Sequence, residues 1–450
     1  MSAEHGADSL RDGRARGAAP RVVIIGAGAA GLLAAAGAAR CGAEVVVLER
    51  NREPGRKLLL SGKGRCNVTY EGDTAALVGG FPGNGRFLFG AFSRFGSADL
   101  RAHLASLGVE TKVERGNRVF PASDEAASVR DALYRDAMAA GCRFLFERRV
   151  TGIAMAPAQN AGSDRARVTA VTAVTGGTAE TFPADAVVIA TGGVSYPGTG
   201  STGDGYVLAR QAGHKVTATF PSLVPLECVE AWPARISGLS LRNIRLRAFA
   251  ADGHELANEF GELLFTHFGV SGPTVLKASR EVSRYLAGGG GPARLSIDLK
   301  PALTAEVLDD RLQRDLELFS NREFRNSLGK LMPASLAAEV VVLSGLEPAK
   351  RCRDLTRQER QKLGALIKGV PLTVKRTRGF REAIVTAGGV DVREVSPRTM
   401  QSELIAGLYF AGEVLDVDGY TGGFNLQAAF ATGRLAGESA ASREGAGNRG

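Results

Sequence analysis

The chain has 450 residues, of which 44% are hydrophobic and 23% are charged. This composition is ordinary for a globular protein of two or three domains, and it excludes collagen-like and low-complexity chains. The net charge of +9 indicates an anionic partner, which could be a phosphorylated cofactor, an acidic small-molecule substrate or nucleic acid. No nucleic-acid-binding signature accompanies the charge, so we expect a small-molecule substrate and no nucleic acid.

The cysteines argue against a metal centre or a disulfide framework. All five (Cys41, Cys66, Cys142, Cys228 and Cys352) lie far apart, and no two are spaced as Cys-x-x-Cys. Zinc sites and redox dithiols need closely spaced pairs, so we expect no metal. The pattern is typical of a protein in the reducing cytoplasm, where we expect this chain to be located.

The two ends of the chain are polar and are predicted to be disordered tails, over residues 1–19 and 441–450. The first tail lacks the apolar core of a secretion signal. The apolar run over 22–39 is interrupted by four glycines. A strand, a tight turn and a helix therefore fit better than a membrane span, and no membrane association is expected.

The sequence GAGAAG at 26–31 fits the pattern G-x-G-x-x-G of dinucleotide-binding turns. In such a turn Gly26 permits the sharp bend, and Gly28 lets the backbone approach a pyrophosphate. Gly31 lets the following helix pack closely on the preceding strand. The helix N-terminus then offers free amides and partial positive charge to the phosphates.

The context of this motif is complete, with a strand expected over 22–25, a helix over 29–40 and a second strand over 44–48. Glu49 ends the second strand, where a carboxylate can bind a ribose 2′-hydroxyl. An acid at this position favours FAD or NAD over NADP. The residues of this unit assigned to the cofactor are Gly26, Gly28, Ala29, Ala30, Gly31, Glu49 and Arg50.

The run ADAVVIATGG at 184–193 reads as a buried strand of the same sheet, whose end lies near the cofactor. The residues assigned to the cofactor here are Ala190, Thr191, Gly192 and Gly193. A second G-x-G-x-x-G match, GTGSTG at 198–203, follows the dipeptide Tyr196-Pro197 instead of a strand. We therefore interpret it as a loop that begins another helix, and not as a second dinucleotide site.

The pattern of apolar and polar residues changes in the middle of the chain. Over 219–299 short apolar segments alternate with turns, which predicts a small β-barrel. Over 304–368 helical periodicity takes over, with charged residues on one face. The sequence therefore predicts a mixed α/β protein in which a Rossmann-like FAD/NAD(P)-binding domain (20–218 and 381–440) is interrupted by a barrel (219–300) and a helical domain (301–380).

The segment 407–437 identifies the dinucleotide. A strand over 408–411 leads to Gly412 and Glu413, and a helix opens at about Gly422 and runs to about Ala436. The exposed amides at that helix start suit the negative charge that a reduced flavin carries near N1, whereas nicotinamide needs no such feature. We therefore expect non-covalent FAD, held here by Gly412, Glu413, Gly423, Phe424, Asn425 and Leu426.

Taken together, these motifs resemble those of an FAD-dependent flavoprotein family that includes aminoacetone oxidase-like and bile-acid reductase-like proteins. The resemblance also includes GRKLLLSGKGRCNVT (55–69), RVFPAS (118–123), GELLFTHFGVSGP (261–273) and VTAGGV (385–390), and it spans about residues 21–440 in one order. It implies a flavin domain broken by a large insertion.

The resemblance further implies that the loop after Glu49 lies along the cofactor, with Lys57, Arg65, Cys66 and Asn67 as its cofactor-binding residues and polar contacts from Arg65 and Asn67. Cys66 in the same loop has no nearby partner thiol, so we favour a packed small residue over a redox thiol. Val150, after the basic strand FLFERR, is expected to offer backbone groups to the adenine, with an ordinary sheet residue as the alternative.

Two residues are candidate catalytic acids. His267 lies in the inserted barrel and Tyr196 beside the strand that ends near the flavin, although a structural histidine is the more ordinary interpretation of the first. The run KRTRGFR at 375–381 could form an anion site for a substrate carboxylate or for NAD(P)H, through Lys375, Arg376 and Arg378. A solvated arginine cluster is the alternative.

We therefore predict an FAD-dependent oxidoreductase in which a hydride passes at flavin N5 between a small organic substrate or NAD(P)H and oxygen or an unsaturated acceptor. NAD(P)H is a candidate transient reductant. Two alternatives remain open, a flavoprotein that acts on RNA and a non-catalytic FAD-binding regulator. No feature of the sequence indicates the oligomeric state.

Overall fold

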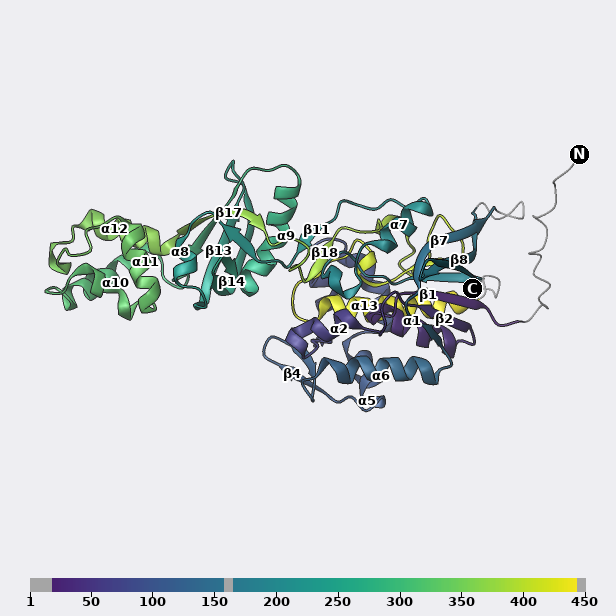
Figure 1. Cartoon of the computed structure of the whole chain (residues 1–450). Helices are drawn as coiled ribbons and strands as arrows, with labels where there is room; N and C mark the ends of the chain where they lie inside the picture. The colour runs from purple at the N-terminus through teal and green to yellow at the C-terminus, as the bar shows by residue number, and fades with distance from the viewer. Residues whose placement is uncertain (1–17, 158–164, 443–450) are drawn as a thin grey trace, which may run out of the picture.

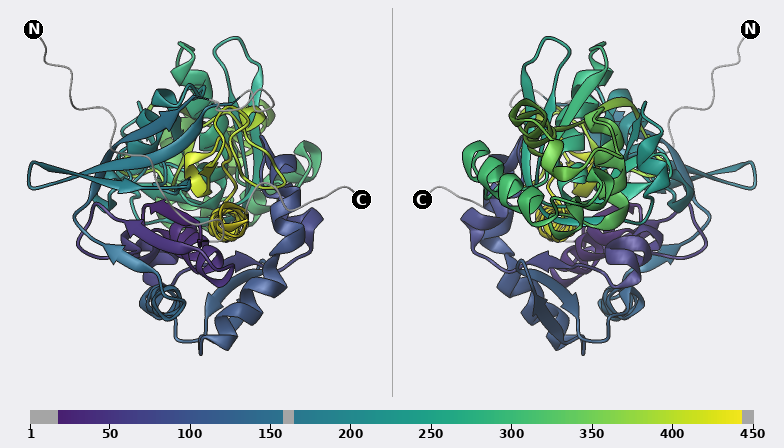
Figure 2. Two further views of the ribbon diagram at one scale, coloured as in Figure 1. Left: turned by 90° about the vertical axis from the view of Figure 1, so that its right-hand side faces the viewer. Right: turned by 90° about the vertical axis from the view of Figure 1, so that its left-hand side faces the viewer.

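The computed structural model describes residues 18–157 and 165–442. Of the predicted disordered tails (1–19 and 441–450), residues 1–17 and 443–450 lie outside the described residues, whereas Ala441 is the last residue of a helix that begins at Phe424. A nucleotide-type domain, a barrel and a helical lobe follow one another along a single long axis (Figure 1). Viewed along that axis, the three parts lie behind one another, with helix α13 seen end-on near the centre (Figure 2).

The nucleotide-type domain is built on a five-stranded parallel sheet in the order β19-β10-β1-β2-β6. Most residues of its central strands are buried, as expected for Val- and Ile-rich strands that are covered on both faces. The strands are β1 (Arg21–Ile25), β2 (Glu44–Leu48), β6 (Arg143–Leu145), β10 (Ala186–Ile189) and β19 (Leu408–Phe410). Segments from both ends of the chain thus share one sheet, which confirms the predicted interrupted α/β domain.

Two small antiparallel sheets flank this domain. The first has the order β3-β5-β4 and the second the order β7-β8-β9. Their strands are β3 (Thr69–Tyr70), β4 (Thr111–Glu114), β5 (Arg118–Pro121), β7 (Arg149–Ala156), β8 (Arg167–Thr175) and β9 (Thr178–Pro183). The remaining helices of the domain are α2 (Arg56–Leu60), α3 (Thr74–Gly79), α4 (Phe89–Arg94), α5 (Ser97–Ser106), α6 (Ala126–Ala139) and α7 (Asp204–Gln211).

The helices α1 (Ala29–Arg40) and α13 (Phe424–Ala441) pack tightly against each other beside the sheet. Glycines make this approach possible, because a Cβ at Gly433 or Gly437 would clash with the carbonyl oxygens of Ala30 and Ala34. The two helices that begin at the predicted cofactor site therefore share one rigid interface.

The Gly433→Ala variant is expected to lower the free energy of unfolding by about 1–3 kcal/mol, because the added methyl group meets backbone that must shift. Gly364→Ala is the matched control, since Gly364 is also helical and its added Cβ would lie 3.6 Å from Leu312 Cδ1, an ordinary contact. Urea unfolding of the two variants measures the difference. Equal stability of both would contradict this account of the helix pair.

The insertion contains a closed six-stranded barrel in the order β12-β15-β14-β13-β16-β17. Its strands are β12 (Leu226–Cys228), β13 (Ser240–Phe249), β14 (Glu255–Thr266), β15 (Gly269–Ser271), β16 (Ala293–Asp298) and β17 (Val370–Thr377). The helices α8 (Trp232–Arg235) and α9 (Pro273–Ala287) pack against it. β17 lies inside the range assigned to the helical domain (301–380) but beyond the helical periodicity, which ends at 368. It belongs to the barrel because it pairs with β12 and β16, which are distant in the sequence.

The helical lobe is inserted between β16 and β17 and consists mainly of α10 (Ala305–Leu318), α11 (Ala334–Ser344) and α12 (Arg357–Lys368). Where the chain leaves and re-enters the nucleotide-type domain, β11 (Phe220–Ser222) and β18 (Val385–Ala387) pair with each other. Within 18–157 and 165–442, no helix combines the length and the apolar character that crossing a bilayer requires.

Candidate functional site

A cleft of about 670 Å³ lies at the carboxyl ends of the parallel strands. It brings together most residues that the sequence assigned to the cofactor, from the beginning, middle and end of the chain. Those that line it are Gly26, Gly28, Ala29, Ala30, Glu49, Arg50, Lys57, Asn67, Val150, Ala190, Thr191, Gly192, Gly412, Glu413, Gly423, Asn425 and Leu426. Gly31, Arg65, Cys66, Gly193 and Phe424 are not part of its lining.

The first wall of the cleft is the turn before α1. Gly26 has φ of 101°, and a Cβ there would lie 2.7 Å from the Ala190 carbonyl oxygen. A Cβ at Gly31 would clash with the Gly26 carbonyl, whereas no atom lies within 4 Å of one at Gly28. The side of the turn at Gly28 is thus open to a ligand. Helix α1 has no side-chain cap and no acid in its first turn, so its N-terminal positive charge is uncompensated there.

Glu49 is held rigidly at the end of β2. Its Oε2 accepts a hydrogen bond from Ala27 N at 2.8 Å. Its Oε1 accepts bonds from Asn51 N at 2.8 Å and from Asn51 Nδ2 at 2.7 Å. The residue is only 6% exposed, yet it lines the cleft. The carboxylate therefore has a fixed orientation and presents an acceptor to the cleft.

The opposite wall is the start of α13, where the N-cap Gly423 has φ of 101° and no side chain caps the helix. The Asn67 amide, oriented to satisfy its neighbours, donates to Thr69 O and Val119 O and accepts from Gly423 N, each at 3.1 Å. Asn67 therefore fixes the turn from outside the helix. Phe424 points away from the cleft lining and stacks on Tyr70, with 4.6 Å between the ring centroids.

An ion pair between Lys57 and Glu413 lies along the same wall. Lys57 Nζ is 2.6 Å from Glu413 Oε2 and 2.6 Å from Ser195 Oγ. Ser195 Oγ also donates to Glu413 Oε1 at 2.7 Å, and Thr386 N donates to the same oxygen at 2.9 Å. The network joins three distant segments at the cleft, and its charges compensate each other.

These features fit an extended dinucleotide such as FAD. The open glycine turn and the uncapped start of α1 suit a pyrophosphate, and the Glu49 carboxylate suits a ribose. The uncapped start of α13 suits the pyrimidine end of a flavin, where negative charge develops on reduction. Within the described residues, no group of three or more His, Cys, Asp or Glu side chains is arranged to hold a metal ion.

Two residues of the loop after Glu49, Arg65 and Cys66, contact other parts of the protein and do not line the cleft. Arg65 forms ion pairs with Glu114 and Asp124, and its guanidinium lies 4.2 Å from the centroid of the Phe120 ring. Cys66 is fully buried, and burial raises the pKa of its thiol to about 12. The thiol is therefore protonated at neutral pH and packs as a small residue. A contact of Arg65 with the cofactor stays a prediction.

The two candidate acids occupy different places. His267 is exposed in the turn between β14 and β15 and does not line the cleft. Tyr196 lines the cleft with φ of 49°, a left-handed conformation that is costly for a tyrosine, and its N donates to Phe380 O at 3.0 Å. Burial, and then the nearby Glu382 carboxylate, raises the pKa of Tyr196 above its usual value. Of the two, only Tyr196 is placed to meet a ligand in the cleft.

The predicted anion site lies outside the cleft lining, and two of its arginines are paired with carboxylates. Arg376 Nε donates to Glu227 Oε2, and Arg378 Nη1 donates to Glu227 Oε1, both at 2.7 Å. Arg378 also binds Glu382. This arrangement matches the alternative of a structural arginine cluster, and a role in binding an anion stays a prediction. The second glycine motif leads into α7, as expected for a loop that begins a helix.

One cleft residue that the sequence analysis missed is Tyr420, in the turn before α13. Burial, and then the Glu259 carboxylate, raises the pKa of its phenol. The Lys277 ammonium lies 5.5 Å from the centroid of its ring. An aromatic residue within the glycine-rich run DVDGYTGGFN was the available signal, because such turns present side chains to a ligand.

The family model described as HI0933-like protein Rossmann domain matches residues 20–439. The chain is 34% identical over 426 residues to the 3-dehydro-bile acid delta(4,6)-reductase of Clostridium scindens. The aligned region covers 94% of this chain and 99% of that protein. The chain is also 32% identical over 417 residues to the ribosomal RNA dihydrouridine synthase of Escherichia coli, covering 91% and 95%. The solved 3-ketosteroid delta1-dehydrogenase from Sterolibacterium denitrificans shares the fold, with a TM-score of 0.53 at 14% identity over 93% of this chain and 99% of that one.

Proposed function

The chain belongs to the HI0933-like family of FAD-dependent oxidoreductases, and from this premise we propose that it reduces a carbon–carbon double bond conjugated to a carbonyl group. The observation that carries the proposal is the cleft, whose lining combines the dinucleotide cradle with the side chains of Tyr196, Ile384 and Tyr420. These side chains are available to contact an acceptor bound in the same cleft as the flavin.

The names of the two relatives support this reaction class. A delta(4,6)-reductase of a 3-dehydro-bile acid saturates ring double bonds conjugated to a ketone. A dihydrouridine synthase saturates the uracil double bond, which is conjugated to a ring carbonyl. Both reactions add a hydride to one carbon and a proton to its neighbour, with two electrons supplied by a reductant. We propose NADH or NADPH as that reductant.

Bound FAD supplies hydride chemistry at N5 of its isoalloxazine ring. The chain itself must hold the acceptor, exclude water and provide the proton. Tyr196 carries the proton, because it lines the cleft and its phenol, like that of a free tyrosine, is protonated at neutral pH. The Lys57–Glu413 pair fixes the wall beside it without adding net charge.

A small conjugated ketone is the substrate class that we favour, since the relative with 34% identity is named for a 3-dehydro-bile acid. The second candidate is a uridine in RNA, which the net charge of +9 and the dihydrouridine synthase relative favour. The cytoplasmic location remains a prediction.

The test is anaerobic. The purified protein, loaded with FAD, is mixed with NADH or NADPH, and the loss of the oxidised flavin absorbance is recorded. The reduced protein is then given a panel of steroid enones, other conjugated ketones and uridine-containing RNA. Return of the flavin absorbance together with a product two mass units heavier supports the reductase, and the reactive panel member identifies the substrate class.

Three outcomes lead to different conclusions. Turnover of a ketone but not of RNA supports the favoured class, and salt-sensitive turnover of RNA alone supports the second. Reoxidation by oxygen with no turnover of any panel member contradicts both reductase proposals and favours the non-catalytic alternative.

A further inference from the structure

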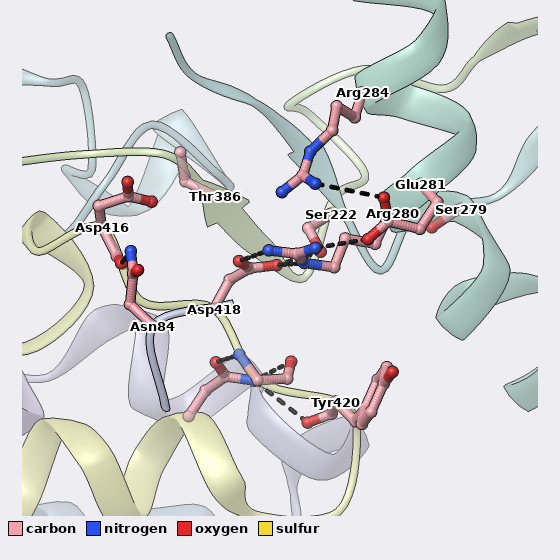
Figure 3. Close-up of polar contacts among 12 residues, drawn as sticks. Asn84, Ser222, Ser279, Arg280, Glu281, Arg284, Thr386, Asp416, Asp418 and Tyr420 are labelled. Atoms are coloured by element: carbon pink, nitrogen blue, oxygen red, sulfur yellow. Dashed lines mark hydrogen bonds and ion pairs between the residues drawn. The ribbon is translucent and has the colours of Figure 1, made fainter. Parts of the chain in front are cut away.

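A buried ion pair joins the inserted barrel to the nucleotide-type domain, close to the β11–β18 junction. Arg280 of α9 binds both carboxylate oxygens of Asp418, through Nε to Oδ2 at 2.8 Å and Nη2 to Oδ1 at 2.9 Å. The two side chains are only 7% and 3% exposed. The guanidinium faces the carboxylate across the boundary between the two parts (Figure 3). This bidentate geometry fixes both direction and distance.

Further contacts restrict the movement of the Arg280 and Asp418 side chains. Ser222 Oγ of β11 donates to Asp418 Oδ2 at 2.9 Å, so the same carboxylate also binds the strand by which the chain leaves the domain. Arg280 Nη1 donates to Glu281 Oε1 at 2.5 Å. A Cβ at Gly83 would lie 2.9 Å from Arg280 Nη2, so the guanidinium also lies against this backbone of the nucleotide-type domain.

Asp418 is the first residue of the turn 418–423, which ends at the start of α13. The next residue, Gly419, donates from its N to Asn425 Oδ1 at 2.8 Å, and Asn425 Nδ2 donates back to Gly419 O at 2.9 Å. Tyr420 N donates to Gly80 O at 2.8 Å. Asn425 and Tyr420 both line the cleft. A displacement of Asp418 would therefore move two cleft residues and the helix N-terminus between them.

We propose that Arg280 is a positioning residue for the flavin, through which the inserted barrel fixes the Asp418–Gly423 turn and the N-terminus of α13 that it presents to the cleft. The inference rests on the FAD position given under the proposed function. It means that FAD binding and the stability of the reduced flavin depend on a residue outside the nucleotide-type domain. A looser turn holds the α13 amides less firmly near the flavin, so the reduced, negatively charged form is stabilised less.

The experiment compares Arg280→Met with Arg284→Met, a control on the same helix. Within the described part of the chain, Glu281 is the one carboxylate that pairs with Arg284, at 3.4 Å, and the Arg284 side chain is 55% exposed. We expect Arg280→Met to raise the dissociation constant for FAD about 10-fold or more and to make the flavin reduction potential more negative. Arg284→Met should leave both values at those of the unmodified protein. Arg280→Lys keeps the charge but not the bidentate contact, so it should restore FAD affinity in part.

Asp418→Asn gives a second route if Arg280→Met does not fold, because it keeps the shape of the side chain and removes its charge. We expect it to shift the potential in the same direction. The double variant Arg280→Met/Asp418→Asn should then be no worse than either single variant, since the two residues act as one unit.

The outcomes separate the two proposals. If the unmodified protein fails to bind FAD, the proposed function is wrong. If the unmodified protein binds FAD, and Arg280→Met loses thermal stability but keeps the FAD affinity and the potential, the pair only fastens the domains and the inference is overturned. Parallel changes in affinity and potential, absent in Arg284→Met and partly reversed in Arg280→Lys, support it.

Discussion

Replacing Tyr196 by Phe is expected to slow reduction of the substrate by about 100- to 10,000-fold, the range typical for loss of a positioned general acid. FAD binding and flavin reduction by NAD(P)H should change little, since among the residues that the structure describes the Tyr196 phenol has no hydrogen bond to those that fit the dinucleotide. The rate of flavin reoxidation by substrate, after anaerobic reduction, measures the effect.

The pH dependence of the rate of flavin reoxidation by substrate tests the same role. The pKa of Tyr196 is raised by burial and then by Glu382, so the protonated, proton-donating form persists to higher pH than for a free tyrosine. The rate in the unmodified protein should therefore fall only as the pH rises through this raised pKa, and Tyr196→Phe should lack that alkaline decline. Tyr420→Phe is the matched control, since Tyr420 also lines the cleft. A collapse of the rate in Tyr420→Phe and not in Tyr196→Phe would transfer the acid role to Tyr420.

The first dinucleotide unit follows from local sequence. Helix Ala29–Arg40 and strand Glu44–Leu48 have the predicted bounds, because the glycines of the turn and the apolar runs around it determine the backbone within about 30 residues. The helix predicted from about Gly422 begins at Phe424 and runs past its predicted end to Ala441. Gly423 ends the turn in a left-handed conformation, which favours glycine, so the sequence predicts where the helix starts. Its alanine-rich C-terminal end has no stop signal, so the sequence does not predict where the helix ends.

The contacts that complete the cleft are non-local and carry no sequence pattern. Lys57 and Glu413 are 356 residues apart, and Arg280 and Asp418 are 138 apart. Each of these residues has an ordinary neighbourhood in the sequence, and the fold alone makes them partners. For the same reason the sequence pattern assigns β17 to the helical domain and not to the barrel, although hydrogen bonds to β12 and β16 close the barrel with it. The sequence therefore predicts most of the glycine turns that line the cleft, but not the contacts between its distant segments.

Glu49→Arg is expected to weaken FAD binding by about 100-fold or more. Two hydrogen bonds from ribose hydroxyls to a carboxylate contribute about 3 kcal/mol together, and about 1.4 kcal/mol corresponds to a factor of ten in affinity. The substitution also removes the acceptor for Ala27 N and Asn51 N and introduces a cation at a position that is 6% exposed. The retained flavin absorbance after gel filtration and the calorimetric dissociation constant measure the loss.

Two further variants decide whether the effect comes from the ribose contact. Glu53→Arg makes the same change of charge at a side chain that is 54% exposed and outside the cleft lining, so it should retain FAD. Glu49→Gln keeps an acceptor oxygen and adds no cation, so its affinity should lie between those of Glu49→Arg and the unmodified protein. Full flavin occupancy in Glu49→Arg would contradict the ribose role. Equal loss in Glu53→Arg would show that the charge of the region, and not this carboxylate, governs binding, because Glu53 lies outside the cleft lining.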